Sequence, residues 1–86
     1  MGLDSVELLL SVEKAFEIEI SDKEANKIIT VGEFYNTVVS KLAEKNSSMS
    51  KEEVWEKLRG MIARKGGLAL DRVVPEARIV KDLGIN

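Results

Sequence analysis

Three short motifs of one form constrain this chain more than any other feature. Each starts with a serine or threonine and has a glutamate three residues later, and the three are Ser21 to Glu24, Thr30 to Glu33 and Ser50 to Glu53. In such a capping box the hydroxyl accepts the amide hydrogen of the third helical residue, and the carboxylate accepts that of the cap residue. Asp4, with Glu7 three residues later, repeats the pattern with an aspartate as the cap. Because each motif opens an apolar run of helical period, the chain is expected to be all-α.

The apolar spacing predicts three longer helices and one short one, near residues 4–16, 23–28, 31–42 and 51–65. The apolar stripe of the first helix is expected to consist of Val6, Leu9, Leu10, Val12 and Phe16. The stripes of the last two helices are expected to be Phe34, Val38, Val39 and Leu42, and Val54, Leu58, Met61 and Ile62, with Trp55 half-buried. Ile18 and Ile20 alternate with glutamates, so this stretch should leave the helix and turn both isoleucines into the core.

Residues 68–86 show no clean helical period, although aliphatic residues recur along them. A structureless stretch of this length inside a small domain is unusual unless it packs on the rest of the protein or has a function. The segment is therefore expected to be a long loop laid across the helices, with Ile79 and Leu83 buried. Gly66 and Gly67 should end the preceding helix, because glycine accepts the left-handed conformation that closes a helix.

The composition excludes several kinds of chemistry. The chain has 86 residues, enough for one small core, and it contains neither cysteine nor histidine. Disulfides, thiolate chemistry, the usual zinc sites and histidine-based acid–base catalysis are therefore excluded. No apolar run approaches the length of a membrane span, and the N-terminus lacks the layout of a signal peptide. We therefore expect a cytoplasmic protein that has no membrane partner.

The charge is divided unevenly along the chain. Residues 1–24 hold seven acidic and two basic residues, a net charge of −5, whereas residues 57–81 hold seven basic and two acidic residues, a net charge of +5. Two complementary faces within the fold explain this division, and so does an acidic docking surface for a basic partner. The net charge of −2 and the separation of the basic residues from aromatic ones argue against nucleic acid as a partner.

The chain stops at "IVKDLGIN" (79–86), which reads as the approach to a helix. When the start of the chain is placed after its end, without Met1, the sequence reads "VVPEARIVKDLGIN" and then "GLDSVELLLSVEKAFEIEISD". In this order Asp82-Leu83-Gly84, Val6-Glu7-Leu8, Phe16 and Thr30-Val31 resemble the acyl carrier protein family without a gap. The resemblance implies a circularly permuted acyl-carrier-like bundle of four helices with a long packed loop.

Under this resemblance, residues 1–86 form a single acyl-carrier-like domain. Residues 1–42 correspond to helices two to four of the family, the serine-rich residues 43–50 to a linker, and residues 51–86 to helix one and the long loop. Circular permutation is tolerated where the native ends lie close together and a linker can bridge them. A closed monomer is expected, and a dimer that exchanges residues 51–86 is the alternative.

The family carries 4′-phosphopantetheine on a serine that follows an aspartate. In the gap-free order Asn86 replaces this aspartate and Gly2 replaces this serine, so the attachment position is vacated and a glycine cannot carry the cofactor. Asp4-Ser5-Val6 has the form of the motif three residues later, and three residues turn a helix by roughly 300° and advance it by about one turn. Ser5 is therefore a candidate attachment residue, with Asp4 beside it; the alternative is that Ser5 is an ordinary residue of the first helical turn.

Two functions of different classes remain open. The first is a carrier that holds acyl intermediates as thioesters on the arm, in fatty acid, polyketide or lipid biosynthesis. The second is an unmodified carrier-like protein-interaction module. In both, the resemblance implies partner enzymes of acyl transfer or biosynthesis whose basic patches dock on Glu7, Glu13 and Glu17. The protein itself is not expected to be an enzyme, because nothing pairs a nucleophile with a base.

Overall fold

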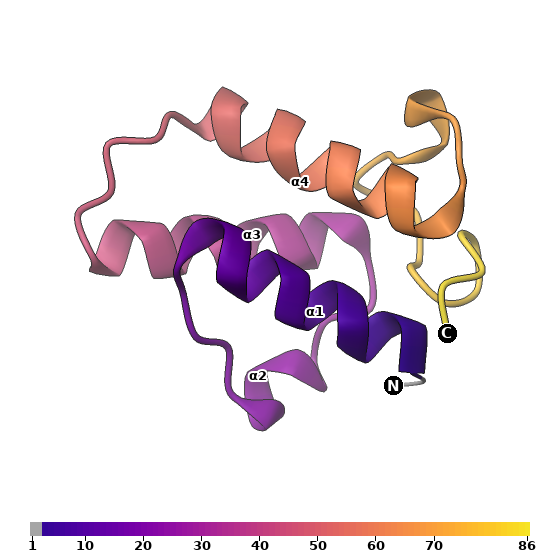
Figure 1. Ribbon diagram of the computed structural model, residues 1–86, viewed down its shortest axis with the longest axis horizontal. Coiled ribbons are helices and arrows are strands. Elements are labelled where there is room, and N and C mark those ends of the chain that lie inside the picture. Colours follow the sequence, from indigo (N-terminus) through magenta and orange to yellow (C-terminus); the bar gives the residue numbers. More distant parts are fainter. Residues whose placement is uncertain (1–2) are drawn as a thin grey trace.

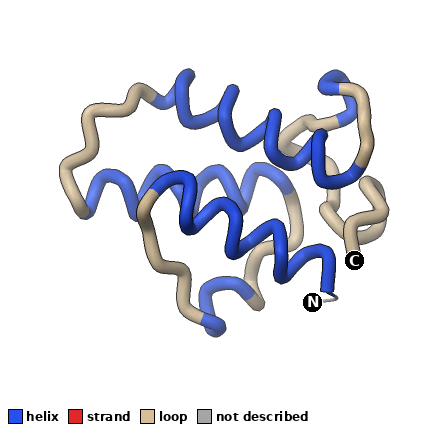
Figure 2. The backbone as a smooth tube through the Cα atoms, viewed as in Figure 1, coloured by secondary structure: helices blue, strands red, loops and turns tan. Residues whose placement is uncertain are grey.

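Four α-helices account for most of residues 3–86, the part of the chain that the computed structural model describes. They are α1 (Leu3–Phe16), α2 (Asp22–Ala25), α3 (Val31–Glu44) and α4 (Lys51–Gly66), and a 3₁₀ turn, η1 (Leu70–Arg72), follows them. No strand occurs in this part of the chain, where the only extended pairing is an isolated bridge between Thr30 and Arg78 (Figure 2). The prediction of an all-α chain is confirmed.

Three of the helices begin at the predicted capping boxes. The hydroxyl oxygens of Ser21, Thr30 and Ser50 each accept the amide hydrogen of the glutamate three residues later, at 3.1 Å. The glutamate carboxylates accept the amide hydrogens of the same three cap residues in return, at 2.8–3.1 Å. The starts of α2, α3 and α4 are therefore set by local sequence.

The helices form a small bundle in which α1 and α3 both contact α4. Figure 1 shows α4 on one side of the molecule and the short α2 on the opposite side, with α1 and α3 between them. The segment after α4 curls back toward the first turn of α1, so the C-terminus and the start of α1 lie on the same side of the molecule. The longer helices contribute most of the core through Leu8, Leu9, Val12, Phe16, Val31, Phe34, Val38, Leu42, Val54, Leu58, Ile62 and Ala63.

The buried face of α1 differs in part from the predicted one. Leu9, Val12 and Phe16 are buried as predicted, but Val6 and Leu10 are exposed at 37% and 58%. Leu8 and Ser5 take their places in the core. Since each helical residue advances by about 100°, the run of three leucines at 8–10 fits two rotations of the helix about its axis. Packing against α4 and the C-terminal segment selects the rotation that buries Leu8.

The other helix predictions need smaller corrections. The short helix predicted at 23–28 is α2, which ends at Ala25 because the amides of Lys27 and Ile28 bond three residues back instead of four. The left-handed Gly67 closes α4, and the amide of Leu68 reaches the carbonyl of Ala63 at 2.8 Å, as in a Schellman motif. Trp55 is half-buried as predicted, whereas Val39 and Met61 reach only the edge of the core.

Residues 68–86 pack on the helices as predicted. Ile79 and Leu83 are each 6% exposed, and the other buried side chains are Val73, Ala77 and Ile85. Backbone bonds tie this segment to the start of α3, since the amides of Val31 and Gly32 donate to the carbonyls of Ala77 and Pro75. Leu70, Val74 and Val80 point outward instead, at 50%, 38% and 45% exposure.

Within residues 3–86 no helix has both the length and the apolar character that a membrane span requires.

Candidate functional site

The first turn of α1 is closed by the other end of the chain. The backbone amide of Ser5 donates to the backbone oxygen of Asn86 at 2.7 Å. The Ser5 hydroxyl donates to the carbonyl oxygen of Ile85 at 3.4 Å. The side chain of Ile85 is only 2% exposed, and Gly84 turns the chain there with φ 70°. The two ends of the described chain therefore meet, at a sequence separation of about eighty residues.

The local cap expected at this helix is different in the structure. α1 already begins at Leu3, so Asp4 lies in its first turn and is exposed, instead of standing at the cap position. An acidic side chain in the first turn still interacts favourably with the positive end of the helix dipole. The oxygen of Asn86, which accepts the Ser5 amide hydrogen, takes the role that a capping side chain has in the other three helices.

Ser5 is the buried polar residue of this site. It is 5% exposed, and both its hydroxyl and its amide donate to backbone oxygens of residues 85–86, which we call the tail. A phosphodiester on this hydroxyl would lie beside two acceptor oxygens and would lose its hydration, which is costly for an unpaired anion. In this arrangement 4′-phosphopantetheine does not fit on Ser5. Gly2, the vacated attachment position of the gap-free order, lies outside the described residues.

The three acidic residues expected to dock partners have separate local roles. The Glu7 carboxylate pairs with Lys65 of α4 at 3.0 Å. The Glu13 carboxylate accepts the amide hydrogen of Ile20 at 2.8 Å and so holds the chain that leaves α1. Glu17 is exposed with φ 55°, and its backbone carbonyl accepts a hydrogen bond from Lys45. They do not form one cluster of unengaged carboxylates.

An apolar stripe stands out on the same helix. Leu3, Val6 and Leu10 are 73%, 37% and 58% exposed. Their spacing of three and four residues places them on one face of α1, opposite the buried face. Exposed aliphatic side chains gathered on one helix face are typical of interaction surfaces. We refer to Leu3, Val6 and Leu10 as the α1 stripe.

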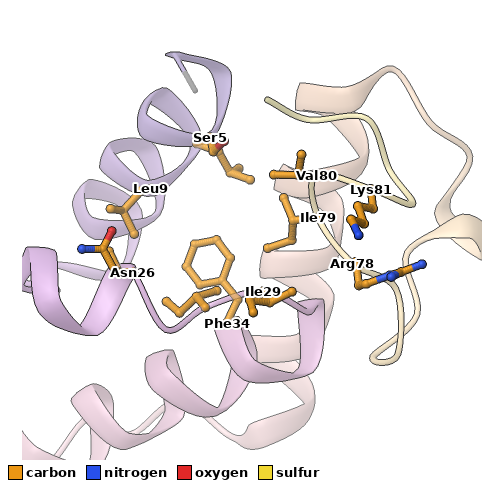
Figure 3. A pocket seen from close by; sticks show the side chains of 12 residues that line it. Ser5, Leu9, Asn26, Ile29, Phe34, Arg78, Ile79, Val80 and Lys81 are labelled. Carbon is orange, nitrogen blue, oxygen red and sulfur yellow. The ribbon is translucent and has the colours of Figure 1, made fainter. Parts of the chain in front are cut away.

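A pocket of about 540 Å³ lies behind the first turns of α1, between this helix, the α2–α3 connection and the C-terminal segment. Figure 3 shows Ser5 and Leu9 on one side of the pocket and Ile79 and Val80 on the other. The Phe34 ring lies between these two sides, and Asn26 and Ile29 belong to the α2–α3 connection. The lining residues are Ser5, Leu8, Leu9, Ala25, Asn26, Ile28, Ile29, Phe34, Arg78, Ile79, Val80 and Lys81. The volume is within the range of small-molecule sites.

The charged residues at this pocket are all on the C-terminal segment. Arg78 is held by Asp82 through two side-chain bonds of 3.1 Å, and Asp82 also accepts the backbone amide hydrogen of Arg78. These bonds hold the pKa of Asp82 below its usual value, first through the Arg78 side chain and then through its backbone. The Arg78 side chain points away from the pocket in Figure 3. Lys81, the other cation of the lining, is not part of this ion pair.

Sequence reasoning missed the pocket completely. Its lining residues come from α1, α2, the α2–α3 connection, α3 and the C-terminal segment, and most of them are ordinary aliphatic residues. The available signals were Ile29 and Val80, two large aliphatic residues that fit no helical stripe and are exposed at 58% and 45%. Both lie on the rim of the pocket.

No family model matches the chain, and no solved structure matches it significantly.

Within residues 3–86 no group of three or more acidic side chains is arranged to hold a metal ion.

Proposed function

We propose that the chain is an acyl-carrier-like domain in circularly permuted order. The support is the contact between Ser5 and residues 85–86, because the rotated sequence order requires the end of the long loop to meet the first turn of α1. The packed loop with buried Ile79 and Leu83 fits the same topology. Of the predicted linker 43–50, residues 43–44 belong to the end of α3, and residues 45–50 join α3 to α4 as a permuted chain requires.

We propose further that the domain functions as an unmodified protein-interaction module that docks carrier-dependent enzymes of acyl transfer or biosynthesis. The observation that carries this choice is the burial of Ser5, whose hydroxyl and amide both bond to the tail. The docking surface is the α1 stripe, since exposed aliphatic side chains contribute more to an interface core than the engaged carboxylates beside them. Glu7 and Glu17 form part of the polar rim.

The second candidate is a true carrier with 4′-phosphopantetheine on Ser5. One observation favours it: Ser5 lines the apolar pocket, so a chain attached there would start next to an apolar space. This candidate requires the tail to leave Ser5, because the hydroxyl is otherwise buried against Ile85.

One experiment separates the two candidates. Isotope-labelled protein is incubated with coenzyme A and a broad-specificity phosphopantetheinyl transferase, and both its mass and its amide spectrum are recorded. The interaction module predicts no added mass and saturable shifts of the amides of Leu3, Val6 and Leu10. One added prosthetic group on Ser5, absent in Ser5→Ala, would establish the carrier instead.

A pair of variants locates the docking surface. Leu10→Lys places a charge in the α1 stripe and should weaken the interaction at least tenfold. Leu70→Lys makes the same change at a leucine of similar exposure, 50% against 58%. Leu70 belongs to η1 and not to the α1 stripe, so this variant should have little effect on the interaction. Equal effects of the two variants would exclude the α1 stripe as the docking surface.

A further inference from the structure

A second pocket lies between α1 and α4. It has a volume of about 410 Å³ and is lined by Leu8, Ser11, Met61, Arg64 and Lys65. Its floor is apolar, since Leu8 is 2% exposed and Met61 is half-buried, whereas Ser11, Arg64 and Lys65 are exposed around it. We refer to it as the α1–α4 pocket. It combines an apolar floor with a basic rim.

The two helices run antiparallel along this pocket. The Lys65 ammonium group pairs with the Glu7 carboxylate at 3.0 Å, and the Lys57 ammonium group donates to the carbonyl oxygen of Ala15 at 3.2 Å. The chain therefore runs in opposite directions along α1 and α4, and Figure 1 shows the start of α1 on the same side as the end of α4. The α1–α4 pocket lies between these two contacts.

The α1 stripe lies directly beside this pocket. Glu7 stands three residues before Leu10 and four residues before Ser11, so on the helix surface it is a neighbour of both. The stripe and the pocket are thus separated by the width of one side chain. A partner helix has a diameter of about 10–12 Å with its side chains, which is enough to cover both. A partner that docks on the α1 stripe therefore also meets the α1–α4 pocket.

The side of the stripe that faces α4 is mainly basic. Four exposed cations belong to it, which are Lys14, Lys57, Arg64 and Lys65. The exposed carboxylates of Asp4 and Glu7 offset part of this charge, and Glu7 is paired with Lys65. Within residues 3–86 no carboxylate forms an ion pair with Arg64 or Lys57. These two side chains keep a positive charge that a partner can pair.

We propose that the partner of the α1 stripe docks with an acidic amphipathic helix. Its apolar side covers Leu3, Val6 and Leu10, and one of its carboxylates lies over the α1–α4 pocket beside Arg64. The charge selects this partner, because a carboxylate gains the unpaired Arg64 whereas a basic side chain would be repelled by it. The inference rests on the proposed docking function and adds the charge of the partner to it. This charge is opposite to that of the basic patches implied by the family resemblance.

Stapled helical peptides of about 18 residues, or five turns, serve as probes. Three peptides share one leucine stripe and one hydrocarbon staple, and they carry glutamate, glutamine or lysine beside the leucines. The glutamate peptide is expected to bind isotope-labelled protein most tightly, with one-to-one stoichiometry, and the lysine peptide least tightly. The amide shifts should include Met61 and Arg64 as well as Leu3, Val6 and Leu10. Raising the salt from about 0.05 M to about 0.5 M should remove most of the preference, because exposed charges are screened.

Variants of Arg64 test the position of the carboxylate. Arg64→Gln should weaken the glutamate peptide about two- to fivefold, the range for an exposed ion pair, and leave the glutamine peptide unchanged. Arg64→Glu should reverse the order, so that the lysine peptide binds more tightly than the glutamate peptide. Lys23→Gln removes the same charge from α2, on the opposite side of the molecule from α4, and is the matched control. Arg64 and Lys23 are both exposed, so none of these changes disturbs the core.

The outcomes separate this inference from the docking function on which it rests. Equal affinities of the three peptides, with shifts confined to Leu3, Val6 and Leu10, would overturn the acidic partner and leave the docking function standing. Tighter binding of the lysine peptide, or equal effects of Arg64→Gln and Lys23→Gln, would do the same. If no peptide shifts the stripe, both proposals fail.

A last comparison uses vesicles of phosphatidylcholine with and without phosphatidylglycerol. The acidic helix predicts that neither kind of vesicle shifts the amides of Leu10 and Arg64. Shifts caused only by the vesicles with phosphatidylglycerol, in the absence of peptide binding, would assign this surface to an anionic lipid surface and overturn the proposal.

Discussion

The starts of α1 and α4 show two different ways of closing a helix. At α4 the Ser50 hydroxyl and the Glu53 carboxylate satisfy each other's backbone amides within four residues. At α1 the amide of Ser5 is satisfied by Asn86, from the far end of the chain. The first arrangement forms as soon as the helix does, whereas the second exists only once the C-terminal segment is packed. Local order at the start of α1 should therefore depend on the loop, and order at the start of α4 should not.

The C-terminus of α1, like its start, is contacted by residues from distant parts of the chain. At its C-terminus the Lys45 ammonium group donates to the carbonyl oxygens of Phe16 and Glu17, and the Lys57 ammonium group donates to that of Ala15. Lys45 follows α3, and Lys57 belongs to α4. The C-terminus of α1 also has a local closure, since Glu17 is left-handed and the Ile18 amide donates to the Glu13 carbonyl at 3.0 Å. Other segments therefore contribute to both termini of α1, and at the N-terminus the described bond comes from the far end of the chain. The proposed docking surface lies along this helix.

The largest effect is expected from the buried anchors of the loop. Leu83→Ala and Ile79→Ala should each lower the free energy of unfolding by about 2–4 kcal/mol, because each removes most of a buried aliphatic side chain. Urea denaturation followed by circular dichroism measures this change. Val80→Ala, in the same segment but 45% exposed, should stay within about 0.5 kcal/mol. Equal effects at Leu83 and Val80 would show that the loop is not packed in solution.

The same variants test the dependence of α1 on the loop. Destabilising the loop through Leu83→Ala should speed hydrogen exchange at the Ser5 amide more than at the Glu53 amide, whose partner is the local Ser50 hydroxyl. An equal increase at both amides would mean that the two helix starts open together.

The sequence predicted what is local in this fold and failed where distant segments meet. The three capping boxes formed at Ser21, Thr30 and Ser50, because each depends on residues four positions apart at most. The burial of Ile79 and Leu83 was predicted because aliphatic residues recur along residues 68–86, which indicated a loop packed across the helices. The rotation of α1 was not, since Leu8, Leu9 and Leu10 offer two equivalent faces and α4 decides between them. The pocket was missed for a related reason, because its lining residues come from five separate segments of the chain.

Removing a local cap should have the next largest effect. Ser50→Ala and Thr30→Ala should each destabilise the protein by about 1 kcal/mol, the usual cost of losing a capping hydroxyl. Ser48→Ala changes an exposed serine of the α3–α4 connection, for which the structure shows no side-chain cap, and should be close to neutral. Thermal denaturation of the three variants measures these changes in stability. A neutral Ser50→Ala would mean that water replaces the hydroxyl at no cost.

Acid should weaken the capped start of α2. The pKa of Glu24 is lowered from 4.5 to about 2, mainly by its bond to Lys41 and then by the backbone and hydroxyl of Ser21. Because the folded pKa is the lower one, this stabilisation is fully present above pH 4.5 and is lost as the pH falls toward 2. Glu24→Gln should therefore flatten the loss of stability over that range. Glu19→Gln, at an exposed position outside the helices, is the matched control, and urea midpoints at several pH values provide the comparison.

The smallest effect is expected from the hydroxyl of Ser5. Its bond to the carbonyl of Ile85 measures 3.4 Å, near the upper limit for a hydrogen bond, so Ser5→Ala should lose only about 0.5–1 kcal/mol. Alanine also favours the helix more than serine does, which offsets part of this loss. Ser11→Ala, at an exposed position of the same helix, has the same propensity gain without a buried bond. The difference between the two variants in urea denaturation therefore isolates the hydroxyl. If Ser5→Ala is as stable as Ser11→Ala, the tail is held at α1 by the Ser5 amide and the Ile85 side chain alone.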